Sequence, residues 1–199
     1  MRDEGELIRA AVEGDLGAFD ELVLRKRERV IRIAFQVTGD LEEAKDVAQA
    51  VFLRLWRVLR RFDPGRRFDT WLYRMTVNLA IDQLRTHGPK GIFEPLPSDP
   101  ALPAPSARFG PEQSLDLAAL QRAFLRLAAR LAPKQRAAFV LREIDGLETA
   151  EVARILGVRE STVRNHLHQA RRILRAGLER DYPALTALFG DRGTGGGAA

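Results

Sequence analysis

GLETAEVARILGVRESTVRNHLHQARRILR, residues 146–175, is the stretch that decides how this chain folds. Apolar residues recur in it at helical spacing, on both sides of a turn at Gly157 where a positive φ is expected. Ala153 is small where two helices must cross closely, and Val163 opens the buried stripe of the second helix. An Ala, a Gly four residues later and a Val six residues after that predict a helix-turn-helix motif.

The outer face of the second helix is positive and rich in hydrogen-bond donors. A helix that reads base edges in the major groove needs such a face. A helical hairpin with a solvated basic face is the alternative, but the spacing, the turn glycine and the face chemistry together favour DNA binding. The residues on this face are Ser161, Arg164, Asn165, His168, Arg171, Arg172 and Arg175.

Proline divides the chain into two parts. Seven of the ten prolines lie between Pro89 and Pro111, and proline blocks helix formation, so residues 88–114 are expected to form an extended linker. It separates a region of residues 1–87 from a region of residues 115–178, while the Gly-rich tail, 179–199, is expected to be largely disordered. Both regions show helical periodicity and no alternation, which predicts an all-α chain of two small helical domains.

Local signals place several helix ends. Gly39 is expected to end a helix and Asp40 to cap the next one, which spans 41–60. A third long helix spans about 69–86. In the second half a helix starts at Pro133, stops before Gly146, and is expected to pack through Phe139, Val140 and Ile144.

The charge of +5 is unevenly distributed along the chain. Residues 1–53 carry a net charge of −4, residues 54–87 carry +5, residues 88–114 carry −1 and residues 115–199 carry +5. Two basic regions separated by a neutral stretch indicate two contacts with one polyanion. The ordinary solvated faces of an Arg-rich protein are the alternative.

The helix over 69–86 carries the second basic face. Arg, Asn and aromatic groups close together suit unpaired bases as well as duplex DNA. A charged face turned to solvent is the alternative, and Trp71 is expected to belong to the core rather than to stack on a base. The candidate residues are Arg74, Asn78, Asp82 and Arg85 on the helix, with Arg66 and Arg67 in the loop before it.

The helix over 41–60 carries an acidic and polar face formed by Glu42, Asp46 and Gln49. In a protein that binds nucleic acid, such a face should contact protein rather than phosphate. A solvated face is again the alternative.

The composition and the motifs argue against several function classes. The absence of cysteine excludes disulfides, thiolate metal sites and thiol catalysis. His166 and His168 lie on opposite sides of one helix and cannot share a metal. No phosphate-binding Gly loop or nucleophile motif is present. We therefore expect no enzymatic activity, no metal, no cofactor and no small-molecule substrate. With no apolar run of 18 residues and no signal peptide, we expect a cytoplasmic protein without membrane insertion.

Three blocks in order resemble the extracytoplasmic-function (group 4) sigma factors of bacterial RNA polymerase, in the sigma-70 family. The resemblance covers roughly residues 10–87 and 115–178. The blocks are DLEEAKDVAQAVFLRLWR at 40–57, FDTWLYRMTVNLAIDQLR at 68–85, and LAPKQRAAFVLREIDGLETAEVARILGVRESTVRNHLHQARRILR at 131–175. They resemble the clamp-binding helix of region 2, its −10 segment and region 4.

The resemblance implies a promoter-specificity subunit that acts with core RNA polymerase, and it implies a role for each face. Leu131 to Leu141 would lie near the polymerase flap. An anti-sigma factor is implied as a further partner. The polymerase clamp would be bound by Glu42, Asp46, Gln49 and Phe52. The opened −10 strand would be read by Arg66, Arg67, Arg74, Asn78, Asp82 and Arg85. The −35 duplex would be read by Glu160, Ser161, Thr162, Arg164, Asn165, His168, Arg171 and Arg172.

Some positions depart from the family pattern. Ala50 stands where Glu is usual and is expected to weaken clamp binding. Arg159 occupies the usual Ser-like cap before the recognition helix. His166 and Gln169 replace residues that are often basic. The alternative function is a two-domain helix-turn-helix regulator that binds duplex operator DNA; an enzyme acting on nucleic acid is disfavoured.

Overall fold

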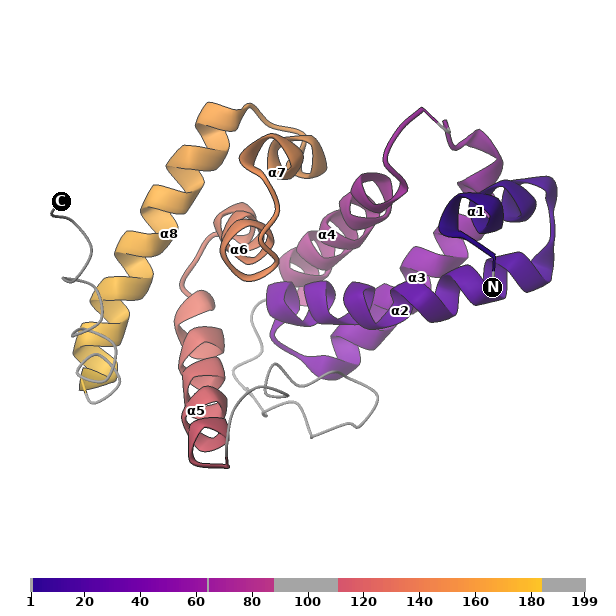
Figure 1. Ribbon diagram of the computed structural model, residues 1–199. Coiled ribbons are helices and arrows are strands. Elements are labelled where there is room, and N and C mark those ends of the chain that lie inside the picture. Colours follow the sequence, from indigo (N-terminus) through magenta and orange to yellow (C-terminus); the bar gives the residue numbers. More distant parts are fainter. Residues whose placement is uncertain (1, 64, 88–110, 184–199) are drawn as a thin grey trace, which may run out of the picture.

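The structure is a computed structural model that describes residues 2–63, 65–87 and 111–183, the side chains at 87 and 111–119 excepted. Within these residues every regular element is helical, which confirms the all-α prediction (Figure 1). The first half holds α1 (Glu4–Glu13), α2 (Leu16–Thr38), α3 (Leu41–Val58), the short 3-10 helix η1 (Leu59–Arg61) and α4 (Phe68–His87). The second holds α5 (Pro111–Ala128), α6 (Pro133–Phe139), the π-helical turn η2 (Val140–Ile144), α7 (Thr149–Leu156) and α8 (Glu160–Asp181).

Side-chain caps fix the starts of the first three helices. Asp40 accepts a hydrogen bond from the backbone N–H of Glu43 at 2.9 Å, which confirms its predicted role. Gly39 ends α2 in the left-handed conformation, with φ 86°, also as predicted. Helix α1 was not predicted, although a reciprocal capping box between Asp3 and Glu6 marks its start.

The core of the first half lies where α2 crosses α3 and α4, with α1 packed against α2. Leu22, Ile33, Val51 and Leu55 are fully buried there, and Leu72 of α4 completes the contact. Each belongs to an apolar stripe with three- and four-residue spacing, so burial of these stripes brings the helices together.

The second half packs around α8, which contacts α5, α6 and α7. Phe124 of α5 stacks on Phe139 of α6 with ring centroids 5.7 Å apart. The prediction that Ile144 packs its helix is wrong, because Ile144 is 43% exposed. The chain turns from α-helical to π-helical geometry at Val140, and the altered periodicity leads Ile144 out of the buried stripe.

The two halves contact each other directly. Helix α4 lies beside α7, and α2 beside α6, so one apolar core includes residues of both halves (Figure 1). Arg136 of α6 is 1% exposed and donates from Nε to the backbone carbonyl of Gln36 in α2 at 2.8 Å. Burial lowers the pKa of Arg136 to about 10, so it is still a cation at neutral pH.

The predicted linker and tail fall largely outside the described residues, which omit 88–110 and 184–199. At their edges the structure shows helix instead: α5 begins at Pro111, and α8 continues to Asp181. Arg130, in the turn just after α5, forms an ion pair with Asp181 at 2.6 Å, which ties the end of α8 back to the end of α5.

Gly177→Ala should destabilise the fold. An ideal Cβ at Gly177 would lie 2.5 Å from Leu127 Cδ2 of α5, and Leu127 is buried. Overpacking of about 1–3 kcal/mol should outweigh the gain of about 1 kcal/mol that alanine brings to a helix interior. Urea unfolding measures the free energy of unfolding. The double variant with Leu127→Ala is the control: it should show a favourable coupling, whereas strict additivity would contradict the close approach.

Candidate nucleic-acid and polymerase interfaces

Helices α7 and α8 form the predicted helix-turn-helix. Gly157 has φ 63°, and its N–H reaches back to the carbonyl of Ala153 to close α7. Ala153 and Val163 are both buried, at 7% and 0% exposure, where the two helices cross. Ala153, Gly157 and Val163 therefore have the burial and backbone geometry that a helix-turn-helix motif requires.

The outer face of α8 is exposed along its length. Arg171 forms an ion pair with Glu143 of η2 at 2.6 Å, and Arg164 pairs with Glu160 at 3.6 Å. Thr162 is only half-exposed and lies off this face. The predicted −35 residues that the structure leaves exposed are Glu160, Ser161, Arg164, Asn165, His168, Arg171 and Arg172.

Two departures from the family pattern turn toward α6. Gln169 accepts a hydrogen bond from Gln135 of α6. His166 is half-buried, and its pKa is lowered by burial and by the nearby Lys134. Because the ordinary histidine pKa already lies below 7, this side chain is neutral at neutral pH. His166 therefore adds no positive charge to α8 at neutral pH.

The start of α8 has no side-chain cap, as the sequence suggested. Arg159 occupies the N-cap position with extended backbone, φ −77° and ψ 153°, and its side chain makes no capping hydrogen bond. A cation at the positive end of a helix dipole is also unfavourable.

The second basic face runs from the loop after η1 along α4. Asp63 organises the loop: its side chain accepts from the N–H of Gly65 at 2.9 Å, and its carbonyl accepts from the N–H of Arg66. Arg66 and Arg67 have side chains 78% and 70% exposed. Also exposed are the predicted −10 residues Arg74, Asn78, Asp82 and Arg85.

An ion-pair triad around the buried Lys26 fixes the start of α4. Lys26 of α2 is 9% exposed and lies 2.7 Å from both Glu4 of α1 and Asp69 of α4. No local spacing in the sequence predicts this contact, because its three members come from three helices. It sets where α4 begins and hence where the loop arginines stand.

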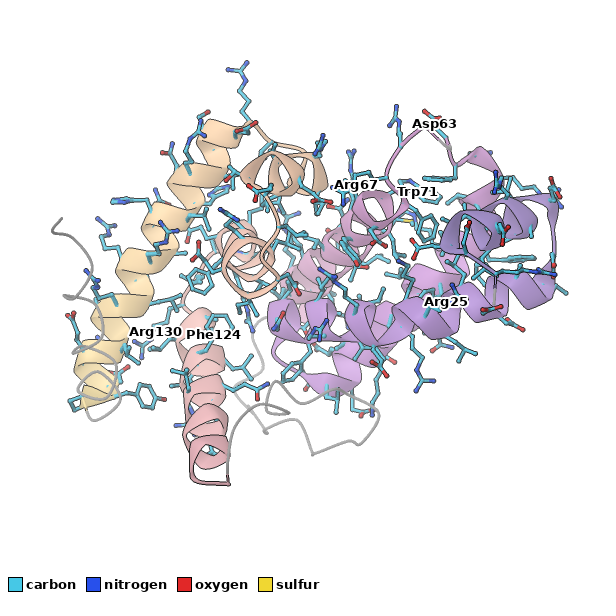
Figure 2. The ribbon with its side chains drawn as sticks, viewed as in Figure 1. Arg25, Asp63, Arg67, Trp71, Phe124 and Arg130 are labelled. Atoms are coloured by element: carbon cyan, nitrogen blue, oxygen red, sulfur yellow. The ribbon has the colours of Figure 1, made fainter. Side chains whose placement is uncertain are left out.

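A cleft of about 780 Å³ separates the start of α4 from the helix-turn-helix. Glu151 of α7, 5% exposed, accepts from Thr70 Oγ1 at 2.9 Å and pairs with Arg67 at 3.3 Å. Trp71 packs its ring 5.1 Å from that of Phe62, as a core residue would, and its half-exposed side also lines the cleft. Figure 2 shows Arg67 and Trp71 at the end of α4 nearest α7.

The acidic face of α3 is exposed, and an apolar surface adjoins it. Asp46 and Gln49 are exposed, while Glu42 pairs with Lys45 at 2.7 Å. Phe52 is half-buried. The sequence analysis missed the neighbouring apolar residues: Leu53 is 54% exposed, and Trp56, 39% exposed, packs 4.8 Å from the ring of Phe19.

Other kinds of site are not found in the described part of the chain. No three His, Asp or Glu side chains there lie where they could hold a metal ion. None of the described helices combines the length and the apolar character needed to cross a bilayer.

The fold and its faces define a class: a two-part helical protein that joins a DNA-reading helix-turn-helix to a second basic helix and an acidic helix. Residues 22–89 match sigma-70 region 2, and residues 121–174 match sigma-70 region 4. The chain belongs to the sigma-70 family, among its extracytoplasmic-function (ECF) members. It is an alternative sigma factor for transcription initiation, and the operator-binding alternative is not favoured.

The similar proteins support this assignment. The ECF RNA polymerase sigma factor SigW of Bacillus subtilis is 30% identical over 84% of this chain and 92% of its own length. The ECF RNA polymerase sigma-E factor of Escherichia coli is 32% identical over 83% of this chain and 88% of its own length. The chain is also 36% identical to SigE of Mycolicibacterium smegmatis, of which it spans 60%.

A solved structure shares the fold. CnrH, in complex with the cytosolic domain of CnrY, superposes with a TM-score of 0.67 and 26% identity, over 89% of this chain and 98% of that one.

Arg159→Ser should stabilise the protein by about 1 kcal/mol, because Ser can accept from the free N–H groups that Arg159 leaves uncapped. A thermal melt should show a rise of about 2–4 °C for a chain of this size. Arg159→Ala is the control, since it removes the cation but cannot cap. Equal midpoints for the Ser and Ala variants would show that capping contributes nothing here.

Proposed function

We propose that this sigma factor binds core RNA polymerase through α3, reads the opened −10 strand with α4 and the loop before it, and reads the −35 duplex with α8. One observation carries the proposal: a single chain presents two separate exposed basic faces and, on a third helix, an exposed acidic face. The basic faces suit two segments of one polyanion, and the acidic face suits a protein.

The α3 surface has the composition of a protein interface. Asp46 and Gln49 supply polar contacts, and the exposed Leu53 and Trp56 supply apolar area beside them. Large apolar side chains next to polar ones are typical of interface centres and rims. Phe52, half-buried between these groups, would contribute one edge of its ring.

The α4 face has the chemistry for unpaired bases. Arg74 and Asn78 are exposed and lie one helical turn apart, and Arg66 and Arg67 lie in the loop before the same helix. Arginine and amide groups bind phosphates and base edges, and a strand held in this way is stabilised in its unpaired state. Asp82 and Arg85, paired at 3.8 Å, extend the same face.

The α8 face has the chemistry for the major groove. Arg164, Asn165 and His168 project from one side of a helix whose other side is buried by Val163 and Leu167. Arg and Asn are the side chains that most often read guanine and adenine edges. Arg171 and Arg172 continue toward where a phosphate backbone would lie.

The remaining parts of the proposal follow the family. We place residues 1–87 as region 2, 88–114 as a connecting segment and 115–178 as region 4, with 131–141 near the polymerase flap. The family resemblance implies an anti-sigma factor as a further partner, and the similar CnrH is solved with a second protein, the cytosolic domain of CnrY, bound to it. We propose that the protein acts in the cytoplasm with RNA polymerase and catalyses no reaction itself.

Replacing Asp46 and Gln49 together with Ala should weaken binding to core RNA polymerase about tenfold, equivalent to about 1.4 kcal/mol. The reason is the loss of the polar contacts on the α3 face. Titration of labelled sigma factor with core enzyme measures the affinity. Glu179→Ala, which removes a carboxylate from the exposed side of α8, is the matched control. Ala50→Glu should raise the affinity, and an unchanged affinity in the double variant would exclude α3 as the clamp surface.

Replacing Arg74 and Asn78 together with Ala should lower promoter opening roughly tenfold while core binding is unchanged, because the unpaired strand loses its contacts. Permanganate reactivity of unpaired thymines reports opening at any promoter that the wild-type holoenzyme transcribes. Arg27→Ala, an exposed arginine on α2, controls for the loss of charge. Normal reactivity in the double variant would refute the −10 role of α4.

A further inference from the structure

One carboxylate of region 4 occupies the proposed −10 face. Glu151 of α7 accepts a hydrogen bond from Thr70 Oγ1 at 2.9 Å and pairs with Arg67 Nη1 at 3.3 Å. Its side chain is 7% exposed, while that of Arg67 is 70% exposed, so a buried carboxylate holds an arginine that solvent still reaches. Figure 2 shows Arg67 at the end of α4 that neighbours α7.

The contact uses the chemistry that a nucleic acid would use. An anionic oxygen that accepts from a guanidinium and a hydroxyl takes the place of a phosphate or a base acceptor. The turn after α7 also approaches Arg74, whose Nη2 would lie 3.8 Å from a Cβ at Gly157. Arg66, Arg67 and Arg74 therefore all line the cleft whose other wall is α7 and the start of α8.

Elsewhere in the contact between the two halves, several buried polar atoms lack hydrogen-bond partners. Among the described residues, no hydrogen-bond partner is found for buried atoms of five side chains where α2 faces α6 and η2. Burial raises the pKa of Asp145, although Arg29 and Arg32 of α2 lower it. Buried polar groups without partners disfavour the closed arrangement, so they lower the free-energy cost of separating the halves. The atoms are Arg29 Nε, Arg32 Nε, Gln36 Oε1, Arg136 Nη2 and Asp145 Oδ2.

We propose that Glu151 is an intramolecular competitor of −10 DNA: it binds Arg67 and Thr70 in the free protein and must leave them before the unpaired strand can bind. The proposal rests on the −10 role proposed for the α4 face. Free sigma factor is then poorly able to bind single strands, and separation of the two halves on the polymerase removes the competitor.

The arrangement blocks only one of the two DNA-reading faces. The outer residues of α8, from Ser161 to Arg172, are exposed in the same structure, and none of them lines the cleft beside α4. Release of Glu151 should therefore strengthen single-strand binding and leave duplex binding by α8 unchanged.

The test compares Glu151→Gln with Glu148→Gln in the full-length protein. Glu148 lies one turn earlier, is exposed, and makes no side-chain capping bond, so its variant matches the change in charge without touching α4. The probe is a fluorescein-labelled 12-nucleotide single strand of random sequence, followed by anisotropy. We expect Glu151→Gln to bind about five-fold more tightly than wild type, at the lower end of typical coupling between sites. Glu148→Gln should stay within twofold of wild type, and random duplex should bind all three alike.

A second readout follows the contact itself. The chain has no cysteine, so dyes can be attached at Leu24→Cys on α2 and Arg175→Cys on α8, both exposed. Glu151→Gln should lower energy transfer between them relative to Glu148→Gln. If Glu151→Gln and Glu148→Gln give the same single-strand affinity, or the same energy transfer, Glu151 is not the competitor. If adding Arg67→Ala to Glu151→Gln leaves single-strand affinity unchanged, the −10 assignment is wrong instead, and energy transfer still decides whether Glu151 holds the halves together.

Discussion

Helix α4 packs against neighbours on two of its sides, and this double burial positions most of what the protein presents to its surroundings. Helices α2 and α3 cover one side, and α6 and α7 of the second half cover the other. Leu72, Val77 and Ala80 are fully buried. Because apolar burial dominates the free energy of such contacts, the helix has little rotational freedom. Only a narrow strip, with Arg74 and Asn78 on it, can face outward.

The contact between the halves combines strong and weak parts. Apolar side chains near α4 and α7 form one continuous core. By contrast, the contact between α2 and α6 holds Arg136, a buried cation whose Nε donates to the backbone carbonyl of Gln36. Each buried polar group left without a partner costs about 1–3 kcal/mol, so this part offsets some of the apolar gain. A contact balanced in this way suits a protein whose two halves are proposed to act at two separate places on a promoter.

The three faces proposed to bind DNA and polymerase lie on different helices, yet one packing arrangement fixes them together. Lys26 joins α1, α2 and α4 and so sets where the loop arginines stand relative to the acidic face of α3. The helix-turn-helix needs no such support, since Ala153, Gly157 and Val163 define it locally. This difference separates the proposed −35 face, whose two helices meet through local contacts, from the proposed −10 face, which depends on the packing of the whole first half.

The sequence by itself determined what depends on neighbouring residues: the all-α class, the cap at Asp40, the stop at Gly39 and the helix-turn-helix. Hydrogen bonds and apolar stripes of this kind connect residues three or four positions apart, so their pattern is visible in the chain. The prediction from the sequence was wrong at Ile144, where a π-helical turn changed the periodicity. Only the tertiary structure could bring Glu151 to Thr70, 81 positions away, or Arg136 to Gln36, 100 positions away. Such contacts follow from how helices pack, and no local spacing encodes them.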